Sequence, residues 1–517
     1  MPERGHDGQH AAGENNTRII GMDVLGPVFF SSAILIILFV IGSLAAPDEA
    51  SRMLGGAKTW TLHNAHWIFS SGTLVTLLFC LVIAVLPLGR IRLGGKQAVP
   101  EFSTPSWLAM LFAAGVGIGM MFWSAAEPLA YYTGWAGTPL GVTPGTPEAE
   151  RLALSATIFH WGLHPWGVYA VIGLALAFFT FNRGLPLSIR SCFYPLLGDR
   201  VWGMSGHIID LVAVVATIFG LATSLGLGAL QAAGGMHYLF GIDAGLTTQL
   251  GIIVAVTSLA ILSVVRGLDR GIRVLSNINV ILAALLLLFV LLVGPTGSIL
   301  ARLPANAINY IVDMVPLSAL TGRQDMGWYQ DWTIFYWAWW ISWSPFVGMF
   351  IARISKGRTV REFLTAVLLM PTLVSVLWFT VFGTTAIGQT QSGIGELGQG
   401  FTEVSLILFQ MLDNLPLAQI ASALAIMLVL IFFVTSSDSG SLVVDTITAG
   451  GKLEPPVKQR IFWASLQGFV AAILLFGGGD EVLGALQAGA ITAALPFTLV
   501  LLMCCVGLYR GLRQEAA

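Results

Sequence analysis

Apolar residues are grouped along the chain in long runs that short polar segments separate. A helix needs roughly 20 residues to cross the ~30 Å hydrocarbon layer of a bilayer, and most of the runs reach that length. We predict twelve membrane-spanning helices, at about residues 25–46, 66–88, 105–126, 152–181, 207–239, 246–265, 274–295, 331–352, 363–388, 415–436, 460–477 and 484–508. The segments 298–318 and 399–413 are too short or too polar to span, and we expect amphipathic helices at the interface there.

The distribution of basic residues supports this assignment, because membrane proteins concentrate Lys and Arg in cytoplasmic loops. With the N-terminus inside, 20 of the 25 basic residues fall in inner segments, and only five fall outside, namely Arg52, Lys58, Arg151, Arg302 and Arg323. A missed or invented span would mix the two sides. We therefore predict a multi-pass protein with both termini in the cytoplasm.

Composition excludes several classes of protein. Of the 517 residues, 56% are hydrophobic and 10% are charged, whereas soluble domains carry about 25% charged residues. The net charge of −2 gives no basic field for a nucleic acid. The first 20 residues have no apolar core of a signal peptide. We expect the lipid bilayer as the main surrounding, with no nucleic-acid partner and no cofactor.

Three glycines interrupt the third span. Gly115, Gly117 and Gly119 occupy every second position, which matches no single face of a helix. Close packing of a small-residue helix is one explanation. Locally extended backbone fits the spacing better, and such backbone occurs at membrane depth only where it lines a site or cavity.

Aromatic residues are concentrated in two spans. Tyr336, Trp340 and Trp343 recur at helical spacing near the middle of the eighth span, and a second group lies at 160–169 around the helix-kinking Pro165. Several ring faces around a dry pocket attract a cation that cannot donate hydrogen bonds, above all a quaternary ammonium group. An aromatic core is the alternative, and the nearby glycine break favours the binding site.

Hydroxyl groups crowd the end of the tenth span, at 432–441. Thr435 and Ser436 could bind a sodium ion together with free carbonyl groups, since hard cations prefer oxygen ligands. The alternative is a hydroxyl-lined helix exit with Asp438 facing cytoplasmic water.

Other polar residues in the spans predict no catalysis. His160 and His164 have the spacing of metal ligands, but without a third ligand we expect structural histidines and no transition-metal site. Glu127, followed by Pro128, is expected to cap or pair locally. A membrane-embedded enzyme would need converging acids, bases or ligands, and a channel would need a filter loop or a ring of like charges. Neither pattern is visible.

These motifs resemble the betaine/carnitine/choline transporter family over about residues 20–508. The resemblance is carried by segments 113–129, 159–170, 331–354 and 432–441. It implies an all-α polytopic protein of twelve transmembrane helices, with spans 3–7 and 8–12 as inverted five-helix repeats. The implied divisions are a cytoplasmic tail (1–22), two peripheral helices (23–100), the first repeat (101–296), a periplasmic amphipathic helix (297–328), the second repeat (329–508) and a short cytoplasmic tail (509–517). Relatives are typically homotrimers of the bacterial cytoplasmic (inner) membrane.

The resemblance also implies which residues bind the ligands. The aromatic box of the family corresponds to Trp161, Trp166, Tyr169 and Trp340, with Trp343 next to it on the substrate path and the Gly115, Gly117 and Gly119 motif beside it. The principal sodium site corresponds to the carbonyls of Ala113, Val116 and Phe432 and the hydroxyls of Thr435 and Ser436. A second sodium site would use Thr217, but Leu221 replaces its second hydroxyl.

The expected function is import of a trimethylammonium-type solute by sodium symport and alternating access. Gly119 stands where proton-coupled choline carriers of the family tend to have an acid, so a zwitterion such as glycine betaine is the expected substrate. Its carboxylate would lie near the freed amides of the broken helix. A proton-coupled choline carrier and a sodium-coupled carrier of dimethylsulfoniopropionate, ectoine or carnitine are the alternatives.

Overall fold

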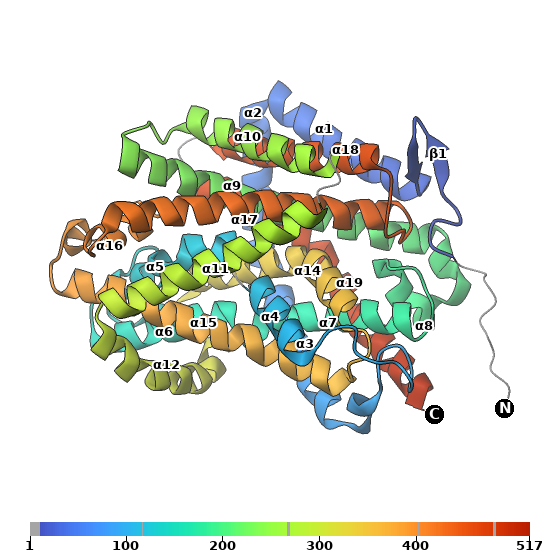
Figure 1. Cartoon of the computed structure of the whole chain (residues 1–517), viewed down its shortest axis with the longest axis horizontal. Coiled ribbons are helices and arrows are strands. Elements are labelled where there is room, and N and C mark those ends of the chain that lie inside the picture. The colour runs from blue at the N-terminus through green and yellow to red at the C-terminus, as the bar shows by residue number, and fades with distance from the viewer. Residues whose placement is uncertain (1–10, 116, 266–268, 401–402, 479–481, 517) are drawn as a thin grey trace.

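The computed structural model describes residues 11–115, 117–265, 269–400, 403–478 and 482–516, and it is almost entirely helical (Figure 1). Its first half contains α1 (Gly26–Ala45), α2 (Pro47–Asn64), α3 (His66–Val85), α4 (Thr104–Gly115), α5 (Ile118–Thr133), α6 (Pro147–Trp161), α7 (Leu163–Phe181), α8 (Tyr194–Leu197), α9 (Met204–Phe240) and α10 (Leu246–Val265). The second half contains α11 (Asp269–Val293), α12 (Thr296–Leu317), α13 (Met326–Trp328), α14 (Phe335–Ile354), α15 (Val360–Gln391), α16 (Ile407–Asp413), α17 (Ala418–Thr448), α18 (Val457–Gly478) and α19 (Val482–Ala516). In the described part of the chain, strands occur only as the short antiparallel pair β1 (Thr17–Ile19) and β2 (Met22–Val24).

The predicted all-α polytopic membrane fold is confirmed. Ten of the described helical segments are long and apolar enough to cross a membrane, and the bent pair of α4 and α5 makes an eleventh. The eighth predicted span corresponds to α14, which is not among these segments because its tryptophans and serines lower its hydropathy. The count of twelve and the inverted repeat therefore stay predictions. The β1–β2 hairpin and the last turns of α19 lie at the same end of the bundle (Figure 1), which fits an even number of crossings.

The helices differ in how much of their surface the protein covers. The residues of α14 are buried along nearly its whole length, against α7, α9 and α19. In contrast, α1, α3 and α10 are at most half buried and expose leucine, isoleucine and valine side chains. Apolar surface of this extent is stable only in lipid. The aromatic eighth span is thus the central helix of the molecule (Figure 1).

Several boundaries differ from the prediction. The tenth span does not end at 436, because α17 continues as a helix to Thr448. The segment 399–413 is not one interfacial helix: in its described residues, a short 3-10 turn ends at Gln399 and α16 follows, with residues 407–412 buried against α5 and α17. The sequence analysis also missed α2 and the strands β1 and β2. The strands are too short for a periodic pattern to reveal them.

The β1–β2 hairpin is fastened to the turn between α17 and α18. Asn16 Nδ2 donates to the carbonyl of Ala449 at 3.0 Å, the amide of Leu25 donates to the carbonyl of Thr448 at 2.8 Å, and the Asp23 carboxylate pairs with Lys452. The hydrogen bond from Lys452 is the main cause that holds the pKa of Asp23 below its ordinary value of 3.8. A lowered carboxyl pKa stabilises the folded state above that pKa, and the contribution is lost as the pH falls through it.

Replacing Asp23 with asparagine should therefore loosen the hairpin at neutral pH. We expect faster amide hydrogen exchange at residues 17–24, measured by mass spectrometry, in D23N than in the unmodified protein. Glu14→Gln, which changes an exposed carboxylate outside the hairpin, is the control and should leave exchange unchanged. Equal protection in all three proteins would show that the ion pair does not hold the hairpin.

Candidate functional site

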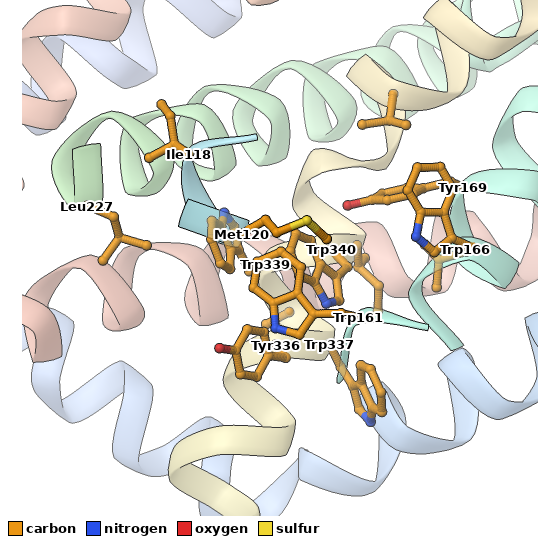
Figure 2. Packing of buried hydrophobic residues seen from close by; sticks show 14 of the residues in the cluster. Ile118, Met120, Trp161, Trp166, Tyr169, Leu227, Tyr336, Trp337, Trp339 and Trp340 are labelled. Carbon is orange, nitrogen blue, oxygen red and sulfur yellow. The ribbon is translucent and has the colours of Figure 1, made fainter. Parts of the chain in front are cut away.

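Aromatic rings from three helices meet at the centre of the bundle. Trp161 lies at the end of α6, Tyr169 lies on α7 and Trp340 lies on α14. The Trp161 and Trp340 rings meet edge to face with their centroids 4.7 Å apart, and Tyr169 meets Trp340 in the same way at 6.3 Å. Figure 2 shows these rings with the Met120 side chain among them. The structure thus brings together three of the four predicted box residues directly.

The remaining predicted aromatic residues lie beside this group. Trp166 joins it through Tyr169, with ring centroids 5.2 Å apart (Figure 2). Trp343 packs on Phe346 at 5.3 Å and lies near Gly117, where an added Cβ would be 4.0 Å from the indole. Trp343 therefore adjoins the helix break, one turn from Trp340.

The rings are held in place by polar contacts as well as by packing. Trp340 Nε1 donates to the carbonyl of His160 at 2.8 Å, next to the point where α6 ends at Trp161 and Gly162 interrupts the helix. Trp339 Nε1 donates to Ser224 Oγ on α9 at 3.1 Å. A trimethylammonium group lies within about 6 Å of each ring face that binds it, so Trp161 and Trp340 must separate to hold one between them.

The break in the third span is confirmed, although not at all three glycines. Helix α4 ends at Gly115, Gly117 is extended with φ −158° and ψ −175°, and α5 begins at Ile118. The axes of α4 and α5 differ by 61°. Since the first amides of a helix have no intrahelical partner, the start of α5 is suited to bind a negative group.

Gly119 was predicted to be extended, and this is wrong: it lies inside α5. A Cβ at this position would be 2.5 Å from Trp339 Cη2 and 2.8 Å from Trp161 Cη2. The glycine is therefore required because two indole rings approach the helix backbone. Spacing alone could not distinguish this clearance from backbone freedom.

Glu127 is the residue that the sequence analysis undervalued. Its side chain is completely buried on α5 and accepts hydrogen bonds from Trp161 Nε1 at 2.8 Å and from Tyr336 OH at 2.5 Å. The other oxygen accepts from Tyr131 OH and from His160 Nδ1, both at 2.9 Å. The carboxylate thus joins α5, α6 and α14 and contacts the aromatic group through Trp161. An acid within an apolar span is rarely without a function, and that signal was available in the sequence.

The two histidines take part in structural contacts. His160 Nε2 is 3.0 Å from Thr333 Oγ1. A neutral ring fits these contacts, because Nδ1 then donates to Glu127 and Nε2 accepts from the Thr333 hydroxyl. His164 stacks on Trp337 at 5.6 Å and contacts Ser318 Oγ. Within the described ranges, no three His, Cys, Asp or Glu side chains are placed to hold a metal ion.

The structure describes all but one of the predicted ligands of the principal sodium site. Val116 lies outside the described residues. Thr435 and Ser436 are half-buried on α17, and Thr435 Oγ1 donates to the carbonyl of Ile431 at 2.9 Å and of Phe432 at 3.2 Å. Ala113 lies two residues before the end of α4. The hydroxyl and the Phe432 carbonyl are therefore adjacent, but their assembly with Ala113 stays a prediction.

The second predicted sodium position has one hydroxyl. Thr217 is buried on α9, and its Oγ1 donates to the carbonyl of Ala213 at 2.7 Å. One turn later, Leu221 packs against Gly440 on α17, where an added Cβ would be 2.5 Å from Leu221 Cδ1. An apolar side chain thus occupies the place expected for a second oxygen ligand.

Comparison with known proteins agrees with the resemblance. The model of the betaine/carnitine/choline transporter family matches residues 27–517. The chain is 57% identical over 508 residues to glycine betaine transporter 1 of Vibrio parahaemolyticus, covering 98% of this chain and 97% of that protein. A glycine betaine/proline/choline/ectoine transporter of the same organism is 52% identical, with 98% and 90% covered. The glycine betaine transporter OpuD of Bacillus subtilis is 44% identical, with 92% of each chain covered.

Proposed function

Because the chain belongs to the betaine/carnitine/choline transporter family, we propose that it imports glycine betaine by sodium symport and alternating access. Family membership makes it a multi-pass transporter of betaine- or choline-type solutes and not an enzyme. We further propose that it works in the bacterial cytoplasmic membrane with both termini inside, as a homotrimer. The observation that carries the proposal is the aromatic group of Trp161, Tyr169 and Trp340.

The chemistry of the site favours a zwitterion. Ring faces attract the trimethylammonium end by their negative quadrupoles, without hydrogen bonds. The start of α5, at Ile118, offers free amides and the positive end of a helix dipole to the carboxylate. The two recognition elements adjoin each other, because Trp343 lies beside Gly117 and Trp161 lies beside Gly119. A compact molecule with a cation at one end and a carboxylate at the other matches this arrangement.

A broader substrate range is the second candidate. A relative that is 52% identical is named a transporter of glycine betaine, proline, choline and ectoine. Dimethylsulfoniopropionate and carnitine share a methylated cation and a carboxylate, and choline has the cation alone. Competition between these solutes decides between a narrow and a broad carrier.

The test is uptake of labelled glycine betaine by a bacterial host that lacks its own carriers, in sodium buffer and in potassium buffer. Choline, ectoine, carnitine and dimethylsulfoniopropionate are added as competitors. We expect saturable uptake in sodium only, with competition strongest from zwitterions. Equal uptake in both buffers would refute sodium coupling and favour proton coupling or exchange.

Removing a hydroxyl ligand should lower the apparent affinity for sodium without removing substrate recognition. For Ser436→Ala we expect the sodium concentration for half-maximal uptake to rise roughly tenfold, the effect of losing one ligand or hydrogen bond to a charged group. Ser439→Ala, which removes a half-buried hydroxyl one turn away on α17, should behave like the unmodified protein. An unchanged sodium dependence in S436A would remove Ser436 from the proposed site.

A further inference from the structure

A polar strip runs between α17 and α18, at the end of the bundle where the β1–β2 hairpin is fastened. Arg460 Nη2 donates to Asp438 Oδ2 at 2.8 Å, Gln467 Nε2 donates to Ser437 Oγ at 3.2 Å, and Trp463 Nε1 donates to Thr448 Oγ1 at 3.0 Å. Side chains of α18 thus reach α17 from its predicted sodium region to its last turn. None of these contacts belongs to the aromatic site.

Asp445 breaks this pattern. It is completely buried on α17, and neither carboxylate oxygen is in hydrogen-bonding geometry with a donor of the described residues. Two donors of α18 beside it are also unsatisfied, Gln459 Nε2 and Arg460 Nε. The Gln459 amide lies close enough to act on Asp445 as a donor, although the geometry falls short of a complete hydrogen bond, and the Arg460 charge acts on Asp445 electrostatically. Complementary donors and acceptors therefore lie close together without a completed hydrogen bond.

Such an arrangement is costly in a buried place, since a polar group there has lost its water without gaining a complete hydrogen bond. Asp438 and Asp445 are seven residues apart, about two helical turns or ~10 Å along α17. A guanidinium presents five N–H groups in a rigid fork, and Arg460 bonds Asp438 through Nη2 while its Nε has no acceptor among the described residues. Arg460 is thus one cation between two carboxylates, bonded to the first in the present structure.

We propose that Arg460 exchanges between Asp438 and Asp445 during transport, so that the interface of α17 and α18 has two hydrogen-bonded arrangements. In the second arrangement Arg460 bonds Asp445, and its hydrogen bond to Asp438 is broken. Asp438 lies two residues after Ser436, so the break occurs next to the predicted sodium hydroxyls. The exchange rests on the proposed alternating access and gives it a bistable element. It would link the predicted sodium hydroxyls to the end of the bundle that carries the β1–β2 hairpin. Arg460 is a positioning residue in this account and touches no substrate.

The exchange is tested by the reactivity of a thiol in the strip. Ser437→Cys is made in a variant whose buried cysteines, Cys80, Cys192, Cys504 and Cys505, are replaced by alanine. Labelling by N-ethylmaleimide is then timed in the purified protein. Asp438→Asn removes the negative charge that holds Arg460 in the present arrangement and should speed labelling roughly tenfold. Asp445→Asn removes the charge that holds Arg460 in the second arrangement and should slow labelling by a similar factor. Each change is the effect of weakening one charge-assisted hydrogen bond.

Opposite signs are the expected result, and equal signs or no change would overturn the proposal. Arg460→Gln removes the shared donor, so in that background the two asparagine variants should label at the same rate. This comparison also serves if one single variant fails to fold. Glu148→Gln, which makes the same kind of change at an exposed carboxylate in the first turn of α6, is the control and should not change labelling. Since labelling needs no transport, its result stands apart from whether glycine betaine is carried with sodium.

Discussion

Replacing Trp340 with alanine should severely impair saturable uptake of glycine betaine. The ring contacts both Trp161 and Tyr169, so its removal opens the aromatic group on two sides. A desolvated cation–π contact contributes ~2 kcal/mol or more, and truncating a buried tryptophan costs about 3–5 kcal/mol through the cavity that it leaves. We expect the ratio of maximal uptake rate to KM to fall at least roughly 100-fold.

Two comparisons separate recognition from folding. Trp340→Phe keeps a ring face but loses the hydrogen bond from Nε1 to the carbonyl of His160, and should lose less uptake than W340A. Trp107→Ala truncates another buried tryptophan, on α4, which donates to Ser355 at the C-terminal end of α14, about four turns from Trp340. It should lower the amount of protein while leaving KM unchanged. A KM in W340A equal to that of W107A would contradict a binding role of Trp340.

Replacing Glu127 with glutamine should impair substrate binding although Glu127 need not touch the substrate. Four donors converge on the carboxylate, and an amide has only one oxygen to accept them. The NH₂ group of glutamine would face two donors, and each buried group left without a partner costs about 1–3 kcal/mol. We expect the KM for glycine betaine to rise by roughly tenfold or more, because Trp161 and Tyr336 lose the group that orients them.

The control for this variant is on a neighbouring helix. Glu148→Gln makes the same chemical change at an exposed position in the first turn of α6, the helix that ends at Trp161. It should leave KM and the sodium dependence unchanged. If E127Q folded to normal amounts and transported like E148Q, the polar network beneath the rings would not position the site.

Some parts of the site followed from the sequence because their signals are local. The helical spacing of Tyr336, Trp340 and Trp343 predicts one aromatic face, and the break at Gly117 follows from glycines that a continuous helix does not need. The fold class followed from apolar runs of sufficient length. Each of these features depends on residues that are neighbours in the chain.

Other parts depend on residues that only the tertiary structure brings together. Glu127 gathers donors from α5, α6 and α14, and its neighbour Pro128 made a local cap seem the simpler explanation. Gly119 serves two indoles from different helices and was mistaken for extended backbone. The length of α17 was underestimated because its hydroxyl groups donate to backbone carbonyls of the preceding turn, as when Ser441 Oγ donates to the carbonyl of Asp438. Polar residues of that kind look like a helix end when burial is unknown.

The central claim is that the rings recognise the positive charge of a methylated ammonium group, and a matched pair of ligands tests it most directly. Glycine betaine and 3,3-dimethylbutanoate have the same shape, but a carbon replaces the charged nitrogen in the second. Binding of each to the purified protein in sodium buffer is measured by isothermal titration calorimetry. The account predicts that the carbon analogue binds roughly 30-fold more weakly or worse, the loss of ~2 kcal/mol of cation–π attraction. Equal affinity for the two would contradict it, because the site would then select shape and the carboxylate without regard to the cation.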